Sequence, residues 1–176
     1  NGIIENSNEL KKDLEDKGYK FKSQTDTEVI TFLLTEFLKE FDLVDAINKT
    51  LKTLNGSFAL GILFKKFNNI VVGARRGSPL AVGYGPEENY LGSDSYALKS
   101  MTNKITYLDD GDVCVLTNNK IEFYNSNNKK INKKVLILSE DKNTAEKGDY
   151  KDFMSKEINE QNITVKTCVK EYVDLL

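Results

Sequence analysis

Residue types that commonly carry catalysis are sparse in this sequence. It contains no histidine among its 176 residues, which excludes Ser-His-Asp and Cys-His catalysis and removes the commonest metal ligand. The two cysteines, Cys114 and Cys168, lie far apart and form neither a disulfide framework nor a zinc pattern. We therefore expect no metal and no other cofactor, and a reducing, cytoplasmic location is the simplest interpretation.

The sequence context of each cysteine favours a structural role. Cys114 lies in the apolar run Val113-Cys114-Val115, which predicts a buried strand. Cys168 lies in the C-terminal tail. The serines have no histidine that would activate them, so a serine nucleophile is not expected either.

Composition and charge favour a single soluble domain. The 25 basic and 27 acidic residues give a net charge of −2, which argues against a nucleic-acid surface. No apolar run is long enough to span a bilayer, and the first residues do not resemble a signal peptide, so no membrane partner is expected.

The hydrophobic periodicity predicts helices first and strands afterwards. Helices are expected at about 7–17, 25–38 and 42–54, and the stretch Thr25-Asp26-Thr27-Glu28 fits a capping box with Thr25 as the N-cap. Strands are expected at 57–64, 70–74, 79–84, 89–92, 105–108, 112–116 and 121–124, with a helical turn at 95–100 and a last helix at 150–161. This order predicts an α+β fold in which helix layers cover stacked antiparallel sheets.

Five short stretches occur in a characteristic order. They are Asn1-Gly2-Ile3-Ile4-Glu5-Asn6, Thr25-Asp26-Thr27-Glu28-Val29-Ile30, Arg76-Gly77-Ser78-Pro79-Leu80, Ser93-Asp94-Ser95-Tyr96-Ala97-Leu98 and 154–161 (MSKEINEQ). In this order they resemble a known family, the glutaminase domain of the glucosamine-6-phosphate synthases (glutamine:fructose-6-phosphate amidotransferases), and the resemblance covers about residues 1–161. The purine-pathway amidophosphoribosyltransferases look similar at the first two stretches and depart at the other three.

The resemblance implies a fold and a mechanism. The fold is that of an N-terminal-nucleophile hydrolase, a four-layer αββα sandwich, here incomplete at its N-terminus. In this family the thiolate of an N-terminal cysteine attacks the side-chain amide of glutamine, and the α-amino group of the same cysteine is the base. The released ammonia passes to a separate isomerase domain, which aminates fructose 6-phosphate.

The resemblance also implies roles for individual residues. Asn1 and Gly2 match the oxyanion hole, where a side-chain amide and a backbone N–H stabilise the tetrahedral intermediate. Asp26 matches the aspartate that holds the α-ammonium group of glutamine. Each has a simpler interpretation: Asn-Gly is a common turn dipeptide, and an aspartate before a helix meets the helix dipole favourably. The Arg76-Gly77-Ser78-Pro79 stretch is interpreted as a structural turn, and Asp94 as a turn or cap residue.

The sequence departs from the family because it holds no N-terminal cysteine segment, no arginine- and histidine-bearing segment that grips glutamine, and no isomerase domain. Residues 1–161 are therefore expected to be a partial glutaminase domain that is inactive alone. Residues 162–176 are expected to be a linker or tail, or a helix of their own. The parent enzyme is expected to be a cytoplasmic homo-oligomer that binds glutamine. Two alternatives remain: the glutaminase domain of a purine-pathway amidophosphoribosyltransferase, and a truncated, non-catalytic binding or assembly domain.

Overall fold

The structure is a computed structural model that describes residues 2–138 and 147–173. The chain divides into two compact units, Asn1–Ser139 and Glu140–Leu176. The first unit opens with α1 (Ser7–Asp16), α2 (Glu28–Phe37) and α3 (Leu43–Thr53), which confirms the three helices expected from periodicity. Asp42 caps α3 by accepting a hydrogen bond from the Asp45 backbone N–H at 3.0 Å.

Two antiparallel sheets follow. The six-stranded sheet has the order β1-β2-β3-β7-β8-β9, and the four-stranded sheet has the order β10-β6-β4-β5. The strands are β1 (Gly2–Ile4), β2 (Gly56–Leu63), β3 (Val71–Arg76), β4 (Ala81–Tyr84), β5 (Asn89–Gly92), β6 (Lys104–Tyr107), β7 (Val113–Leu116), β8 (Ile121–Tyr124), β9 (Lys130–Ile131) and β10 (Leu136–Ile137). The short helix α4 (Ser95–Leu98) follows β5.

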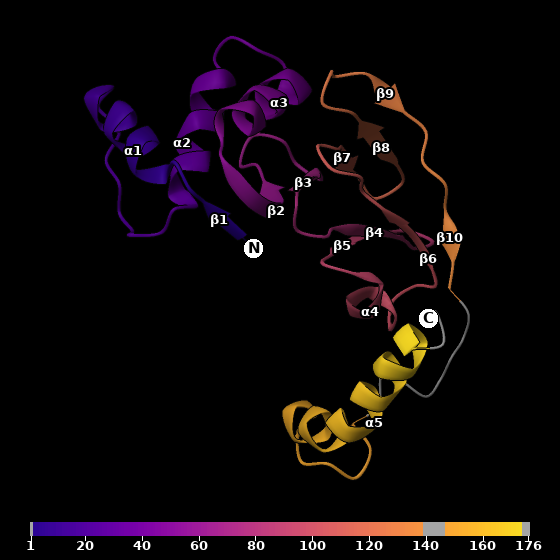
Figure 1. Cartoon of the computed structure of the whole chain (residues 1–176). Coiled ribbons are helices and arrows are strands. Elements are labelled where there is room, and N and C mark those ends of the chain that lie inside the picture. Colours follow the sequence, from indigo (N-terminus) through magenta and orange to yellow (C-terminus); the bar gives the residue numbers. More distant parts are fainter. Residues whose placement is uncertain (1, 139–146, 174–176) are drawn as a thin grey trace. The chain divides into compact units, whose positions relative to one another are not determined.

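The sheets form the inner layers of a sandwich. The first core holds the inward side chains of α1–α3 together with one face of the six-stranded sheet, including Val113 and Val115. Their neighbours Cys114 and Leu116 point to the opposite face and join the core between the two sheets. A third core packs Leu98 of α4 against the four-stranded sheet. Within the first unit the layers therefore run α, β, β, α, as expected, and Figure 1 shows α1–α3 grouped beside β1–β3.

β6 and β7 follow one another along the chain but lie in different sheets, β6 in the four-stranded sheet and β7 in the six-stranded sheet. Two local expectations were wrong. The capping box at Thr25 does not form. Glu28 instead accepts hydrogen bonds from the backbone N–H groups of Lys22 and Ser23 at 2.9 and 2.7 Å. Its carboxylate therefore holds the loop that precedes α2.

The second error concerns the end of the last helix, which was expected at Gln161. In the second unit, α5 (Phe153–Val173) continues well past Gln161. Neither glycine nor proline follows Gln161 to stop it, and the hydroxyls of Thr164 and Thr167 donate to carbonyls one turn back. Across residues 2–138 and 147–173, no helix combines the length and apolar character that crossing a membrane requires.

A buried ion pair fixes the crossing between the two sheets. Lys133 lies between β9 and β10, and its ammonium group pairs with Asp112, whose side chain is only 6% exposed. Burial lowers the pKa of Lys133, but hydrogen bonds to Asp109 and Asp112 outweigh this effect and raise the pKa, so the lysine stays charged. Asp112 also accepts from the Asp109 backbone N–H at 2.8 Å.

We expect Lys133→Met to lower the free energy of unfolding by about 3–5 kcal/mol, because it leaves the Asp112 carboxylate buried without its cation. Lys130→Met is the matched control. Lys130 pairs with Glu122 at the surface and is 56% exposed, so its loss is expected to leave the free energy of unfolding nearly unchanged. Urea unfolding measures both, and equal effects for the two variants would contradict this view of Lys133.

Candidate functional site

Gly2 lies in β1, at the edge of the six-stranded sheet, where it is paired with Phe58 of β2. Its φ is +115°, a conformation that side-chain-bearing residues rarely adopt. A Cβ at this position would lie 2.1 Å from the Ser57 carbonyl oxygen and 2.6 Å from the Phe58 Cα. Only glycine therefore allows β1 to approach β2 as it does. Asn1, predicted as the partner of Gly2, lies outside the described residues.

Asp26 contacts the same strand from the other side. Its Oδ2 accepts a hydrogen bond from the Ile4 backbone N–H at 2.7 Å, and its Oδ1 accepts one from the Thr27 hydroxyl at 3.2 Å. The next N–H, that of Glu5, donates to the Asn55 carbonyl on the opposite side. Because N–H groups alternate along a strand, the Ile4 N–H faces away from β2. The half-buried Asp26 carboxylate thus occupies the free edge of the strand that contains Gly2.

The Gly-Ser-Pro stretch lies beside the same end of β2. A Cβ at Gly77 would lie 2.2 Å from the Ser57 Oγ, and Gly77 has a φ of +74°. The Ser57 and Ser78 hydroxyls are 3.2 Å apart. Ser57 therefore contacts both Gly2 and Gly77, so two of the stretches singled out in the sequence meet at one residue.

The two arginines before this turn are used structurally. Arg76 donates to the carbonyls of Leu51 and Leu54 at 2.7 and 2.5 Å, which satisfies the C-terminal end of α3. Arg75 donates to the Leu108 carbonyl at 2.8 Å and to the Gly77 carbonyl at 3.1 Å. These contacts agree with the structural interpretation of the turn. Sequence reasoning missed the role of Arg76, because a strand residue that caps a distant helix leaves no local pattern.

Asp94 is a helix cap. Its carboxylate accepts a hydrogen bond from the Ala97 backbone N–H at 2.9 Å, and this confirms the cap interpretation. The helix that it caps, α4, packs through Leu98 in the core on the far side of the four-stranded sheet. This stretch therefore supports the fold and does not join Gly2 and Asp26.

The cysteines occupy very different environments. Cys114 is fully buried in β7, and desolvation by burial raises the pKa of its thiol to about 12. Cys168 is exposed on α5 in the second unit. A buried thiol with a high pKa is a poor nucleophile, so Cys114 is a core residue as predicted. Within the described residues, no cluster of three or more His, Cys, Asp or Glu side chains could hold a metal ion.

We expect Cys168 to react with iodoacetamide at pH 8 far faster than Cys114 in the folded protein, because Cys168 is exposed, whereas Cys114 is buried and burial raises the pKa of its thiol. Mass spectrometry of the alkylated peptides measures each site separately. In urea the two rates should become similar. Rapid alkylation of Cys114 without urea would contradict its burial.

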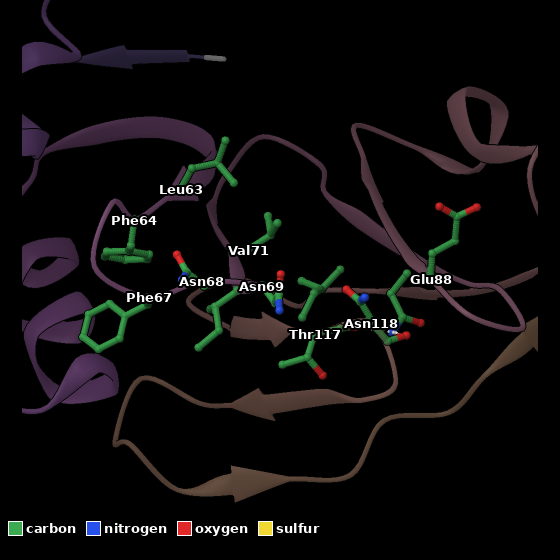
Figure 2. A pocket seen from close by; sticks show the side chains of 12 residues that line it. Leu63, Phe64, Phe67, Asn68, Asn69, Val71, Glu88, Thr117 and Asn118 are labelled. Carbon is green, nitrogen blue, oxygen red and sulfur yellow. Dashed lines mark hydrogen bonds between the residues drawn. The ribbon is translucent and has the colours of Figure 1, made fainter.

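A hollow of about 670 Å³ lies at the opposite end of β2 from Gly56. Figure 2 shows Phe64 and Phe67 on one side of it and the side chains of Asn68, Thr117 and Asn118 around it. The amide of Asn89, at the start of β5, donates to the Thr117 carbonyl at 2.6 Å and joins the two sheets there. The hollow contains none of the predicted site residues, so it is separate from the Gly2 and Asp26 edge.

Comparison with known proteins identifies the class. Residues 1–100 match the family model described as "Glutamine amidotransferase domain", and the chain belongs to this family. Several relatives are named glutamine–fructose-6-phosphate aminotransferase [isomerizing]. The protein from Zymomonas mobilis is 45% identical over 98% of this chain, and that from Mesorhizobium japonicum is 44% identical over 100% of it. The chain spans only 29% of the length of either relative.

A solved structure supports the fold. The glutamine phosphoribosylpyrophosphate amidotransferase from B. subtilis, complexed with ADP and GMP, superposes with a TM-score of 0.61 at 25% identity. The match covers 72% of this chain and 28% of that chain. The fold is thus that of an amidotransferase of the expected α+β, N-terminal-nucleophile type.

Proposed function

We propose that this chain is part of the glutamine-hydrolysing domain of an enzyme that transfers the amide nitrogen of glutamine to fructose 6-phosphate and forms glucosamine 6-phosphate. The observation that carries the proposal is the placement of Gly2 and Asp26 along one free strand edge. The relatives at 44–45% identity carry the name of this reaction, and they favour it over the phosphoribosyl reaction named for the 25% identical structure.

The edge of β1 sets the spacing of the two assigned contacts with glutamine. N–H groups two residues apart face the same edge, and the rise is about 3.4 Å per residue, so positions 2 and 4 lie about 7 Å apart. Asp26, on the Ile4 N–H, is assigned to the α-ammonium group. The Gly2 N–H, about 7 Å along the edge, is assigned to the oxyanion at the side-chain amide carbon. The Asn1 side-chain amide is assigned as the second oxyanion donor.

The reaction requires a thiolate that neither cysteine of this chain supplies. Cys114 is buried with a pKa of about 12, and neither Cys114 nor Cys168 is an N-terminal residue of the kind that the family's mechanism uses. We therefore assign the nucleophile to a cysteine of the longer protein, as the family resemblance implies. Its sulfur forms a bond to the amide carbon, the C–N bond breaks as the nitrogen takes up a proton, and ammonia leaves. Water then cleaves the thioester and releases glutamate.

The remaining parts of the proposal concern the longer protein. Residues 1–161 are assigned to the glutaminase domain, and 162–176 to a connection towards an isomerase domain in the remaining length of the relatives. The parent protein is proposed to be a cytoplasmic homo-oligomer. A non-catalytic assembly role is less well supported, because it gives no reason for the glycine that position 2 requires or for a carboxylate on the same edge.

Glutamate release from glutamine tests the hydrolytic part. We expect the full-length protein to release glutamate, and we expect no release by the 176 residues alone or by the full-length protein with its N-terminal cysteine changed to alanine. Glutamate release by the isolated 176 residues, or equal release with and without that cysteine, would overturn the assignment. A full-length protein that releases no glutamate would favour the assembly role.

A further inference from the structure

We propose that Asp26 is also a positioning residue, which holds the β1 strand in place and with it the Gly2 N–H. The effect of this contact on catalysis rests on the proposed function. A ligand for the substrate's ammonium group needs only a free carboxylate oxygen. In this structure, Oδ2 of Asp26 is hydrogen-bonded to the Ile4 N–H at 2.7 Å, across 22 residues of sequence. The carboxylate therefore joins the start of α2 to the strand that carries the oxyanion donor.

Within the described residues, the outer edge of β1 is not paired with another strand. β1 has only three residues, and in the described part of the sheet it pairs with β2 alone. Ile4 is 4% exposed and anchors one end of the strand, whereas Ile3 is 67% exposed. Gly2 itself has no side chain to pack, and glycine is the residue with the greatest backbone freedom. The hydrogen bond between Asp26 and the Ile4 N–H therefore helps to hold the Gly2 N–H in position.

A carboxylate can serve the strand and the substrate together. Each of its oxygens accepts more than one hydrogen bond, so an ammonium group can bind while the Ile4 N–H remains bound. The negative charge strengthens the bond to the Ile4 N–H relative to a neutral acceptor. Substrate binding and strand position thus share one side chain, and the oxyanion donor is fixed before glutamine arrives.

Two substitutions separate these roles in the full-length protein. Asp26→Asn removes the charge but keeps a carbonyl oxygen that can accept from Ile4, whereas Asp26→Ala removes both. Hydrogen–deuterium exchange of peptides covering residues 2–5 reports on the strand directly. We expect Asp26→Ala to speed exchange of the Ile4 amide about tenfold, because one charge-assisted hydrogen bond is lost. Asp26→Asn should change the exchange rate by less than about threefold, because the amide oxygen can still accept from Ile4.

The kinetics should divide in the same way. Both variants should raise the KM for glutamine, because both lose the charge that faces the ammonium group. Only Asp26→Ala should also lower kcat, by about ten- to a hundredfold, since a shift of the donor by about 1 Å is enough for such a loss. Asp26→Ser, whose hydroxyl is too short to reach Ile4, should behave like the alanine variant and serves if that variant does not fold.

Asp42→Ala is the matched control, because Asp42 also accepts a backbone N–H at a helix start, on α3, but contacts Asp45 and not β1. It should leave Ile4 exchange and kcat unchanged. Unchanged Ile4 exchange in Asp26→Ala, or equal kcat in the alanine and asparagine variants, would overturn the positioning role. If the protein hydrolyses no glutamine, the exchange result still decides whether Asp26 holds β1, so failure of the proposed function is recognised separately.

Discussion

Replacing Gly2 by alanine in the full-length protein is expected to lower kcat for glutamine hydrolysis by about 10²–10³-fold, the loss that follows removal of one oxyanion donor. The added Cβ would lie 2.1 Å from the Ser57 carbonyl oxygen, a distance that forces the backbone to move. The φ of +115° is also strained for alanine. The strand must therefore shift away from β2, and the Gly2 N–H moves with it. Rates of glutamate release measure this effect.

Gly18→Ala is the matched control for the strain of a positive φ. Gly18 has a φ of +90°, and apart from its two chain neighbours no described residue has an atom within 4 Å of a Cβ placed on it. It follows α1 and is remote in sequence from β1. The control should lose about 1–2 kcal/mol of stability and keep its kcat. Full activity of Gly2→Ala, or equal losses in the two variants, would contradict the role of Gly2.

The second large effect is expected in the choice of substrate. Asp26→Asn should lower kcat/KM for glutamine by about thirty- to a hundredfold, because an ammonium group then faces a neutral amide, a change of about 2–3 kcal/mol. For N-acetylglutamine, which has no ammonium group, the same substitution should change kcat/KM by less than about threefold. The unmodified protein should therefore prefer glutamine strongly, and the variant should lose most of this preference.

Asp42→Asn provides the corresponding control, since it alters a carboxylate at the start of α3 that has no assigned contact with substrate. Its substrate preference should equal that of the unmodified protein. Equal losses on both substrates in Asp26→Asn would mean that Asp26 acts only through the strand. No loss on glutamine would mean that the ammonium group binds elsewhere.

Strong periodicity made most of the fold predictable. α1–α3 were expected because their apolar residues repeat at helical spacing, and β2 and β3 were expected because each is an apolar run of strand length. β1 was missed because three residues are too few to show a period. The assignment of β6 and β7 to different sheets also gave no local sign, since a turn such as Asp109-Asp110-Gly111 looks the same in a hairpin and in a crossing between sheets.

The site residues were predictable only through the family resemblance. Nothing local distinguishes Gly2 from a turn glycine, or Asp26 from an aspartate that faces a helix dipole. Their connection through the Ile4 N–H spans 22 residues and depends on how α2 packs against β1. The pairing of Lys133 with Asp112 could not be predicted either, because it depends on how the chain crosses between the two sheets, which no local sequence pattern indicates. Such contacts are fixed by tertiary structure, which single-sequence patterns do not contain.

Transfer of labelled nitrogen tests the central proposal most directly. The full-length protein is given glutamine labelled with ¹⁵N at the side-chain amide, with fructose 6-phosphate or phosphoribosyl pyrophosphate as the acceptor. We predict ¹⁵N in glucosamine 6-phosphate, formed only with fructose 6-phosphate and formed about 10²–10³-fold more slowly by the Gly2→Ala variant. Label in phosphoribosylamine would instead identify the purine-pathway reaction. Label in neither product, together with no glutamate release, would contradict a catalytic role for this domain.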